Sequence, residues 1–183
     1  MKYYQLAQFD NVETITKKLQ HHLVSYLQTD QNLHTVVQPH EWRLVVPELY
    51  EQFHAMNLQP DMIRVFLTAP NKGLPIHIDG SDTIKKVFAL NWPVYNSNQC
   101  VMSWYKVLNQ NLCLVANAKY SPQIVMYTPD MCSEVDRLII EQPTWVRINV
   151  PHSVYNKHTH NRIVVSFRFV PEPYHLLEAE LNS

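Results

Sequence analysis

Three side chains that bind transition metals lie in two short segments of the sequence, His77-x-Asp79 and His152. Residues 74–79 are mostly apolar and read as a β-strand. Since side chains i and i+2 of a strand point to one face, His77 and Asp79 are expected on one side and apolar residues such as Leu74 on the other. His152 follows the apolar run 145–151 and is expected at the end of a later strand. Two histidines and one carboxylate can form a facial triad, which leaves coordination positions open and suits non-haem Fe(II).

An arginine, Arg162, follows His152 at a short spacing and stands at the head of the last predicted strand. Alternate residues of this strand form an apolar set, expected to pack against helices, and a mixed set, expected to line a cavity. The apolar set is Ile163, Val165, Phe167 and Phe169, and the mixed set is Arg162, Val164, Ser166 and Arg168. An arginine in a cavity can hold a carboxylate by two parallel charge-assisted hydrogen bonds. With the metal triad, Arg162 therefore indicates a site for a chelating dicarboxylate.

A second pair, His158 and Arg168, has the same spacing as His152 and Arg162. We prefer the first pair because His158 lies in the polar segment 156–161, which we interpret as a loop with no strand leading into it.

In these residues the sequence resembles the Fe(II)/2-oxoglutarate-dependent oxygenases, whose core is a double-stranded β-helix. His77-x-Asp79, His152 and Arg162 occur in the order of that family. The resemblance covers about residues 61–170, and its local sequence context is similar to small bacterial and phage members, some of them allied to the aspartyl/asparaginyl β-hydroxylases. It implies that the triad holds Fe(II), and that Arg162 binds the distal carboxylate of 2-oxoglutarate as cosubstrate.

The resemblance also implies an activity: hydroxylation of a small polar or peptide-borne substrate, with release of succinate and CO2. Polar residues on neighbouring predicted strands, Asn91, Ser103 and Tyr105, are candidates for contacting the cosubstrate or the substrate. Two other functions stay open. One is a cupin-like metalloenzyme that uses the triad without 2-oxoglutarate, and the other is a non-catalytic jelly-roll binding module in which the His/Asp pair is incidental.

The secondary structure expected to position these residues changes at about residue 61, from helices before it to strands after it. Apolar residues recur at helical spacing over residues 11–28, and Pro47 favours the start of a second helix. From about residue 61, short β-type runs alternate with clusters of turn-forming residues. The runs are 62–68, 74–79, 86–95, 100–108, 123–127, 138–140, 145–150 and 163–169.

We therefore predict one α+β, mainly β domain over residues 1–183. A helical layer is expected over about residues 1–60, a jelly-roll core over about 61–170 and a C-terminal tail over 171–183. Residues 130–137 are considered as a short helix.

Composition excludes several classes of protein. Of the 183 residues, 46% are hydrophobic and 17% are charged, which is typical of a folded globule. A formal net charge of -1 gives no indication of a nucleic-acid partner, and no apolar run suggests a membrane span. Without a secretion signal at the start, a cytoplasmic location is expected. Three separated cysteines form no metal-binding motif, so any metal must be held by histidine and carboxylate. The oligomeric state stays open.

Overall fold

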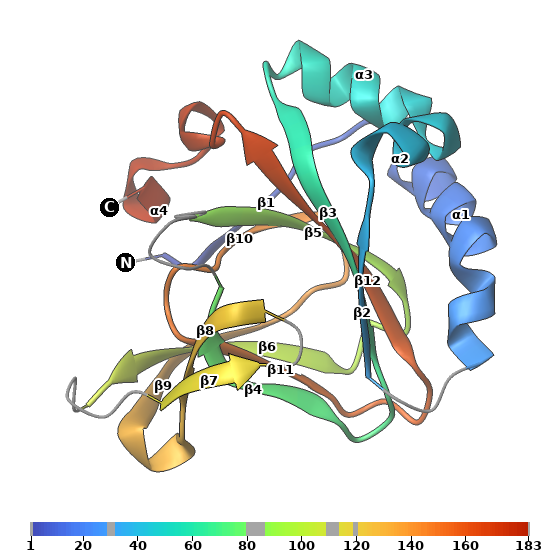
Figure 1. The fold of residues 1–183 in the computed structure, drawn as a ribbon. Coiled ribbons are helices and arrows are strands. Elements are labelled where there is room, and N and C mark those ends of the chain that lie inside the picture. Colours follow the sequence, from blue (N-terminus) through green and yellow to red (C-terminus); the bar gives the residue numbers. More distant parts are fainter. Residues whose placement is uncertain (1, 29–31, 80–86, 109–113, 119–120, 183) are drawn as a thin grey trace.

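Two six-stranded antiparallel sheets face each other in the computed structural model, which describes residues 2–28, 32–79, 87–108, 114–118 and 121–182 (Figure 1). The first sheet contains, in spatial order, β1 (Tyr4–Leu6), β10 (Thr144–Arg147), β5 (Phe88–Tyr95), β12 (Arg162–Val170), β3 (Gln59–Thr68) and β2 (Leu33–Val37). The second contains β7 (Leu114–Ala118), β8 (Ser121–Tyr127), β4 (Gly73–Ile78), β11 (His152–Asn156), β6 (Cys100–Val107) and β9 (Cys132–Ile139). The predicted fold class, mainly β with a jelly-roll core, is confirmed.

Helices from the first third of the chain cover the outer face of the first sheet (Figure 1). They are α1 (Val12–Leu23), η1 (Val24–Gln28), α2 (Pro39–Val45) and α3 (Pro47–Ala55). The helices expected over residues 11–28 and from Pro47 are therefore present, while α2 was not predicted. The described part of the chain contains no helix that is long and apolar enough to cross a membrane.

The first sixty residues, expected as a helical layer, also supply strands β1 and β2, which form the two edges of the first sheet. Both strands are short, as edge strands commonly are. Strand β2 contains the β-branched residues Thr35, Val36 and Val37, which favour a strand. The prediction of a helical layer did not take them into account.

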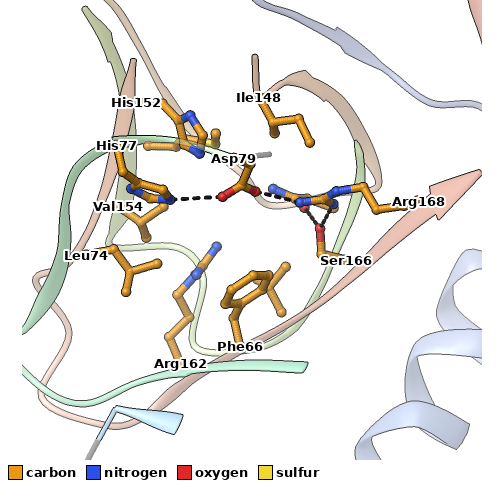
Figure 2. Close-up of a pocket in the computed structure, with 13 residues that line it drawn as sticks. Phe66, Leu74, His77, Asp79, Ile148, His152, Val154, Arg162, Ser166 and Arg168 are labelled. Atoms are coloured by element: carbon orange, nitrogen blue, oxygen red, sulfur yellow. Dashed lines mark hydrogen bonds and ion pairs between the residues drawn. The ribbon is translucent and has the colours of Figure 1, made fainter. Parts of the chain in front are cut away.

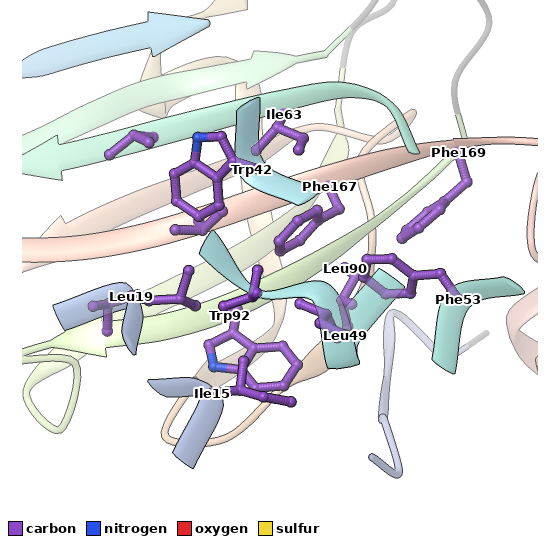
Figure 3. Close-up of a cluster of buried hydrophobic side chains, with 14 of the residues drawn as sticks. Ile15, Leu19, Trp42, Leu49, Phe53, Ile63, Leu90, Trp92, Phe167 and Phe169 are labelled. Carbon is purple, nitrogen blue, oxygen red and sulfur yellow. The ribbon is translucent and has the colours of Figure 1, made fainter. Parts of the chain in front are cut away.

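The main hydrophobic core lies between these helices and the first sheet (Figure 3). Ile15 and Leu19 of α1 and Phe53 of α3 are fully buried there. The ring of Phe53 lies 5.3 Å from that of Phe167 and 4.9 Å from that of Phe169, centroid to centroid. The apolar set of β12 thus packs against the helices as predicted, and its other face is left for the cavity between the sheets.

The C-terminal segment, expected as a tail over 171–183, contains η3 (Tyr174–Leu176) and the short helix α4 (Ala179–Asn182). Leu181 is fully buried in the main core. Lys2 Nζ lies 2.6 Å from Glu178 Oε2, so the two ends of the chain are side by side (Figure 1).

The helix considered for residues 130–137 is wrong. A single 3-10 turn, η2 (Pro129–Met131), is followed by strand β9, which pairs with β6 from Val107↔Cys132 to Val101↔Ile139. Cross-strand hydrogen bonding along this edge outweighs the local helical tendency of the segment. Leu138 also packs against a second buried cluster that lies between the sheets.

Strands β4 and β11 approach closely at Gly73, and we expect Gly73→Ala to destabilise the protein. A Cβ atom there would lie 2.4 Å from the carbonyl oxygen of Val154, a backbone atom that cannot move alone. Forced rearrangements of this kind cost about 1–3 kcal/mol. Urea denaturation should show that loss. Lys106→Ala on β6, at an exposed position, should change stability by less than about 0.5 kcal/mol. Equal midpoints for the two variants would contradict the close approach.

Candidate metal centre

Two neighbouring strands bring the three predicted metal ligands together. His77 lies near the end of β4, Asp79 follows that strand directly, and His152 is the first residue of β11. His77 and His152 are cross-strand partners with ring centroids 4.5 Å apart. One ligand atom from each of the three residues lies within 4.8 Å of the others. Figure 2 shows the three side chains converging on the cavity between the sheets.

Backbone carbonyls fix the orientation of both imidazole rings. Nδ1 of His77 lies 2.7 Å from the oxygen of Pro75, and Nδ1 of His152 lies 2.9 Å from the oxygen of Val150. Each Nδ1–H can donate to its carbonyl, which leaves both Nε2 atoms for a metal. Two imidazole nitrogens and one carboxylate oxygen on one side of a common point are the donor set of a facial triad. This set fits Fe(II).

The protonation of the triad also suits a cation. Burial, followed by the charge of His77, lowers the pKa of His152 to about 4, so this ring is neutral near pH 7. Burial alone would lower the pKa of His77, but the hydrogen bond and charge of Asp79 raise it. Nε2 of His77 lies 3.1 Å from Oδ1 of Asp79. A bound cation would replace the proton shared between these two atoms.

One apolar neighbour of the triad does not lie where alternation predicts. Leu74 lines the cavity together with His77, although it was expected on the opposite face of the strand. The pairing of β4 with β11 shifts from His152↔His77 to Val154↔Leu74, which places one extra residue in β4. This bulge reverses the alternation between positions 74 and 77. Pro75 within the run was the available signal, because proline in a strand often marks a bulge.

His152 begins a strand, whereas it was expected to end one. Strand β11 was not predicted, and it leads directly into the loop that contains His158. The stated reason for preferring His152 over His158 was therefore wrong. His158 nevertheless lies outside the triad: its Nδ1 is 3.3 Å from Nδ1 of His160 in an exposed part of the loop.

Arg162 points into the same cavity as the triad (Figure 2). The cavity-lining residues of β12 are those of the predicted mixed set: Arg162, Val164, Ser166 and Arg168. Arg162 is 4% exposed, and burial lowers the pKa of its guanidinium. Its Nε is buried without a hydrogen-bond partner, and no ion pair links it to a described carboxylate. A buried guanidinium in this state can bind an anion, because leaving it unpaired is unfavourable.

A second arginine of β12, Arg168, holds the triad carboxylate. Its Nη2 donates to Oδ2 of Asp79 at 2.7 Å, and its Nη1 donates to Oγ of Ser166 at 2.6 Å. The hydroxyl of Ser166 in turn donates to Oδ1 of Asn91. Burial alone would raise the pKa of Asp79, but His77 and Arg168 hold it well below its usual range. Sequence reasoning placed Arg168 on the cavity face but gave it no role.

We expect Arg168→Met to lower the free energy of unfolding of the metal-free protein by about 3 kcal/mol or more. The reason is that Asp79, only 12% exposed, would lose its guanidinium partner inside the protein. Urea denaturation of the metal-free variant measures the change. The matched control is Arg137→Met, which breaks an exposed pair with Glu134 and should cost less than about 1 kcal/mol. Similar losses in the two variants would contradict a buried ion pair.

Of the three polar residues considered for cosubstrate or substrate contacts, Asn91 lines the cavity and Ser103 and Tyr105 do not. Met102 of the same strand, β6, lines the cavity, so its odd-numbered neighbours face the other way. The hydroxyl of Tyr105 forms a 2.9 Å hydrogen bond with Oγ of Ser153 on that outer face.

The fold is shared with solved structures that contain 2-oxoglutarate, although no protein-family model and no curated sequence matches the chain. The viral collagen prolyl hydroxylase vCPH of Paramecium bursaria Chlorella virus-1, a complex with 2-oxoglutarate, has a TM-score of 0.55 and 10% identity over 92% of this chain and 95% of its own. The epimerase SnoN, in complex with Fe3+, α-ketoglutarate and a nogalamycin compound, has a TM-score of 0.54 and 12% identity over 91% and 77%. HygX of Streptomyces hygroscopicus, with nickel and 2-oxoglutarate bound, has a TM-score of 0.53 and 11% identity over 91% and 80%. At the level of the fold, the resemblance found in the sequence is confirmed.

Proposed function

We propose that this chain is an Fe(II)- and 2-oxoglutarate-dependent oxygenase. The observation that carries the proposal is one cavity that combines a facial triad with a buried guanidinium, Arg162, that forms no ion pair with a carboxylate of the described residues. Neither the triad alone nor the arginine alone would indicate 2-oxoglutarate. Together they match the two ends of 2-oxoglutarate, a chelating 2-oxo acid and a distal carboxylate.

Different residues of the cavity would bind the metal and the cosubstrate. Nε2 of His77, Nε2 of His152 and one oxygen of Asp79 would hold Fe(II), and Arg162 would bind the distal carboxylate of the cosubstrate. When bound, Fe(II) with 2-oxoglutarate supplies the oxidising chemistry: one atom of O2 enters succinate as CO2 is released, and the other enters a C–H bond of the substrate. Hydroxylation of a small polar or peptide-borne compound is the outcome we propose.

The chain's other contributions are orientation and exclusion of water. Arg168 fixes one oxygen of Asp79 and leaves the other directed towards His77. Apolar side chains such as Phe66 and Ile148 line the cavity beside the triad and keep water from the reacting atoms (Figure 2).

The assay is formation of succinate from 2-oxoglutarate in the presence of Fe(II), ascorbate and O2. Without substrate, slow uncoupled turnover is expected, and His77→Ala should reduce it to the background of free Fe(II). His158→Ala, which removes a histidine from the loop, should leave the rate unchanged. Wild-type protein that forms no succinate and binds no 2-oxoglutarate would refute the proposal.

A second candidate, a cupin-like metalloenzyme that does not use 2-oxoglutarate, is favoured by the size of the cavity. In the present side-chain arrangement the cavity measures about 30 Å3, which suits water or a small ligand. Binding of 2-oxoglutarate therefore requires lining side chains to move apart. If the second candidate is correct, Arg162→Leu will leave metal binding and any turnover untouched.

A further inference from the structure

A third arginine, Arg64 of β3, lies on the cavity face of the first sheet. It is the cross-strand partner of Ser166, which lines the cavity, and Phe66, two residues further along β3, lines it as well. Side chains at directly paired positions, and at i and i+2, share a face of the sheet. Arg64 therefore projects to the same side as the triad.

The guanidinium of Arg64 has no anionic partner in the described part of the chain. The side chain is half-buried, and its Nε donates a hydrogen bond of 3.2 Å to Sδ of Met62. Its positive charge contributes to the lowered pKa values of His34 and Arg168 and opposes the raised pKa of His77, so it is close enough to act on the groups around the cavity.

A histidine beside Arg64 adds a second unsatisfied polar group. His34 of the edge strand β2 pairs with Phe66, and the two rings stack at 4.9 Å with an angle of 5° between their planes. Its Nε2 is buried without a hydrogen-bond partner. Burial and the charge of Arg64 lower the pKa of His34, so its ring is neutral and can still donate one hydrogen bond.

Among the residues that the structure describes, the charges that face the cavity include none that pairs with Arg64. Asp79 pairs with Arg168, and in the proposed oxygenase the distal carboxylate of 2-oxoglutarate pairs with Arg162. The paired positions on β12 separate Arg64 from Arg162 by four residues, or about 13 Å along the strand. The backbone positions of the two arginines are therefore distinct, so each guanidinium can bind an anion of its own.

We propose that Arg64, with His34 beside it, binds an anionic group of the substrate, a carboxylate or a phosphate, next to the metal centre. The inference rests on the proposed oxygenase function and adds a substrate class to it. Val36, the partner of Arg64 on the edge strand β2, is 53% exposed, so the sheet meets solvent next to Arg64. Bidentate hydrogen bonding by a guanidinium favours such planar or tetrahedral oxyanions over neutral groups.

The test follows the side-chain Nε–Hε signals of arginine by NMR in protein loaded with Zn(II) and 2-oxoglutarate. Propionate and inorganic phosphate are the probes, and propionamide is the uncharged control for propionate, all at constant ionic strength. At least one anion should give a saturable shift of the Arg64 signal, and propionamide should give none. A response to propionate alone assigns a carboxylate, and a response to phosphate alone assigns a phosphate.

Two variants test whether the anion binds at Arg64. Measured by titration calorimetry, Arg64→Gln should weaken binding of the anion at least tenfold, whereas Arg137→Gln, which removes an exposed arginine on β9, should leave the affinity unchanged. The inference is overturned if neither anion gives a saturable shift, if propionamide binds equally well, or if Arg64→Gln binds the anion as wild type does.

If the proposed oxygenase function is wrong, the responses of the two arginine signals differ from those expected if the anion site is wrong. The Arg162 signal reports 2-oxoglutarate independently of the Arg64 titration. If Arg162 does not respond to 2-oxoglutarate while Arg64 responds to an anion, the oxygenase proposal fails and an anion site remains. The reverse pattern rejects the anion site and keeps the oxygenase.

Discussion

Replacing His152 with alanine is expected to weaken the binding of Fe(II), or of Co(II) as a spectroscopic probe, by about 100-fold or more. Loss of a residue that only orients a metal ligand commonly costs about 10–100-fold in affinity, so loss of a ligand should cost at least as much. Burial keeps His152 neutral, and Val150 fixes its ring, so the Nε2 atom is ready to bind without prior rearrangement. Anaerobic titration calorimetry measures the affinity directly.

The matched control is His158→Ala, since His158 lies in the loop that follows the same strand. It should bind metal as wild type does, and circular dichroism should show that both variants are folded. Comparable affinity in wild type and His152→Ala would contradict a metal site at the triad.

Arg162→Leu is expected to impair binding of the cosubstrate without affecting binding of the metal. The variant should bind Fe(II) normally and lose about 100-fold or more in affinity for 2-oxoglutarate, because hydrogen bonds to charged groups contribute about 1.5–3 kcal/mol each and two would be lost. The metal-free variant should be at least as stable as wild type, since it no longer buries a guanidinium that lacks an ion pair with any carboxylate of the described residues. Titration calorimetry and thermal unfolding, each with and without 2-oxoglutarate, measure these effects.

Arg137→Leu on the exposed face of β9 is the control for loss of an arginine, and it should behave as wild type in both measurements. Unchanged affinity of Arg162→Leu for 2-oxoglutarate would exclude a role for this residue in cosubstrate binding. A large loss of stability in the metal-free variant would show instead that Arg162 supports the fold.

Residue spacing was sufficient to predict the triad and the cavity arginine. His77 and Asp79 are close in sequence, and the strong alternation of β12 separates Arg162 from the apolar residues that pack on the helices. Such information is local. The alternation of β12 is kept in the fold, and the bulge in β4 leaves the relation between His77 and Asp79 unchanged because it lies before His77.

Other features depend on contacts between distant segments and were therefore missed. The bulge that turns Leu74 into the cavity exists because β4 must pair with β11, and the role of Arg168 arises only when β12 lies opposite Asp79. Strand β11 is five residues long and follows a proline, so pairing with β4 and β6 defines it more than its own sequence does.

The most direct test of the central claim is anaerobic addition of Fe(II) and 2-oxoglutarate to the purified protein, followed by visible absorption. Chelation of Fe(II) by a 2-oxo acid within the triad should produce a charge-transfer band that saturates at one equivalent of each and that is absent when either is omitted. Protein that binds Fe(II) at the triad but gives no such band and no measurable 2-oxoglutarate affinity would contradict the account.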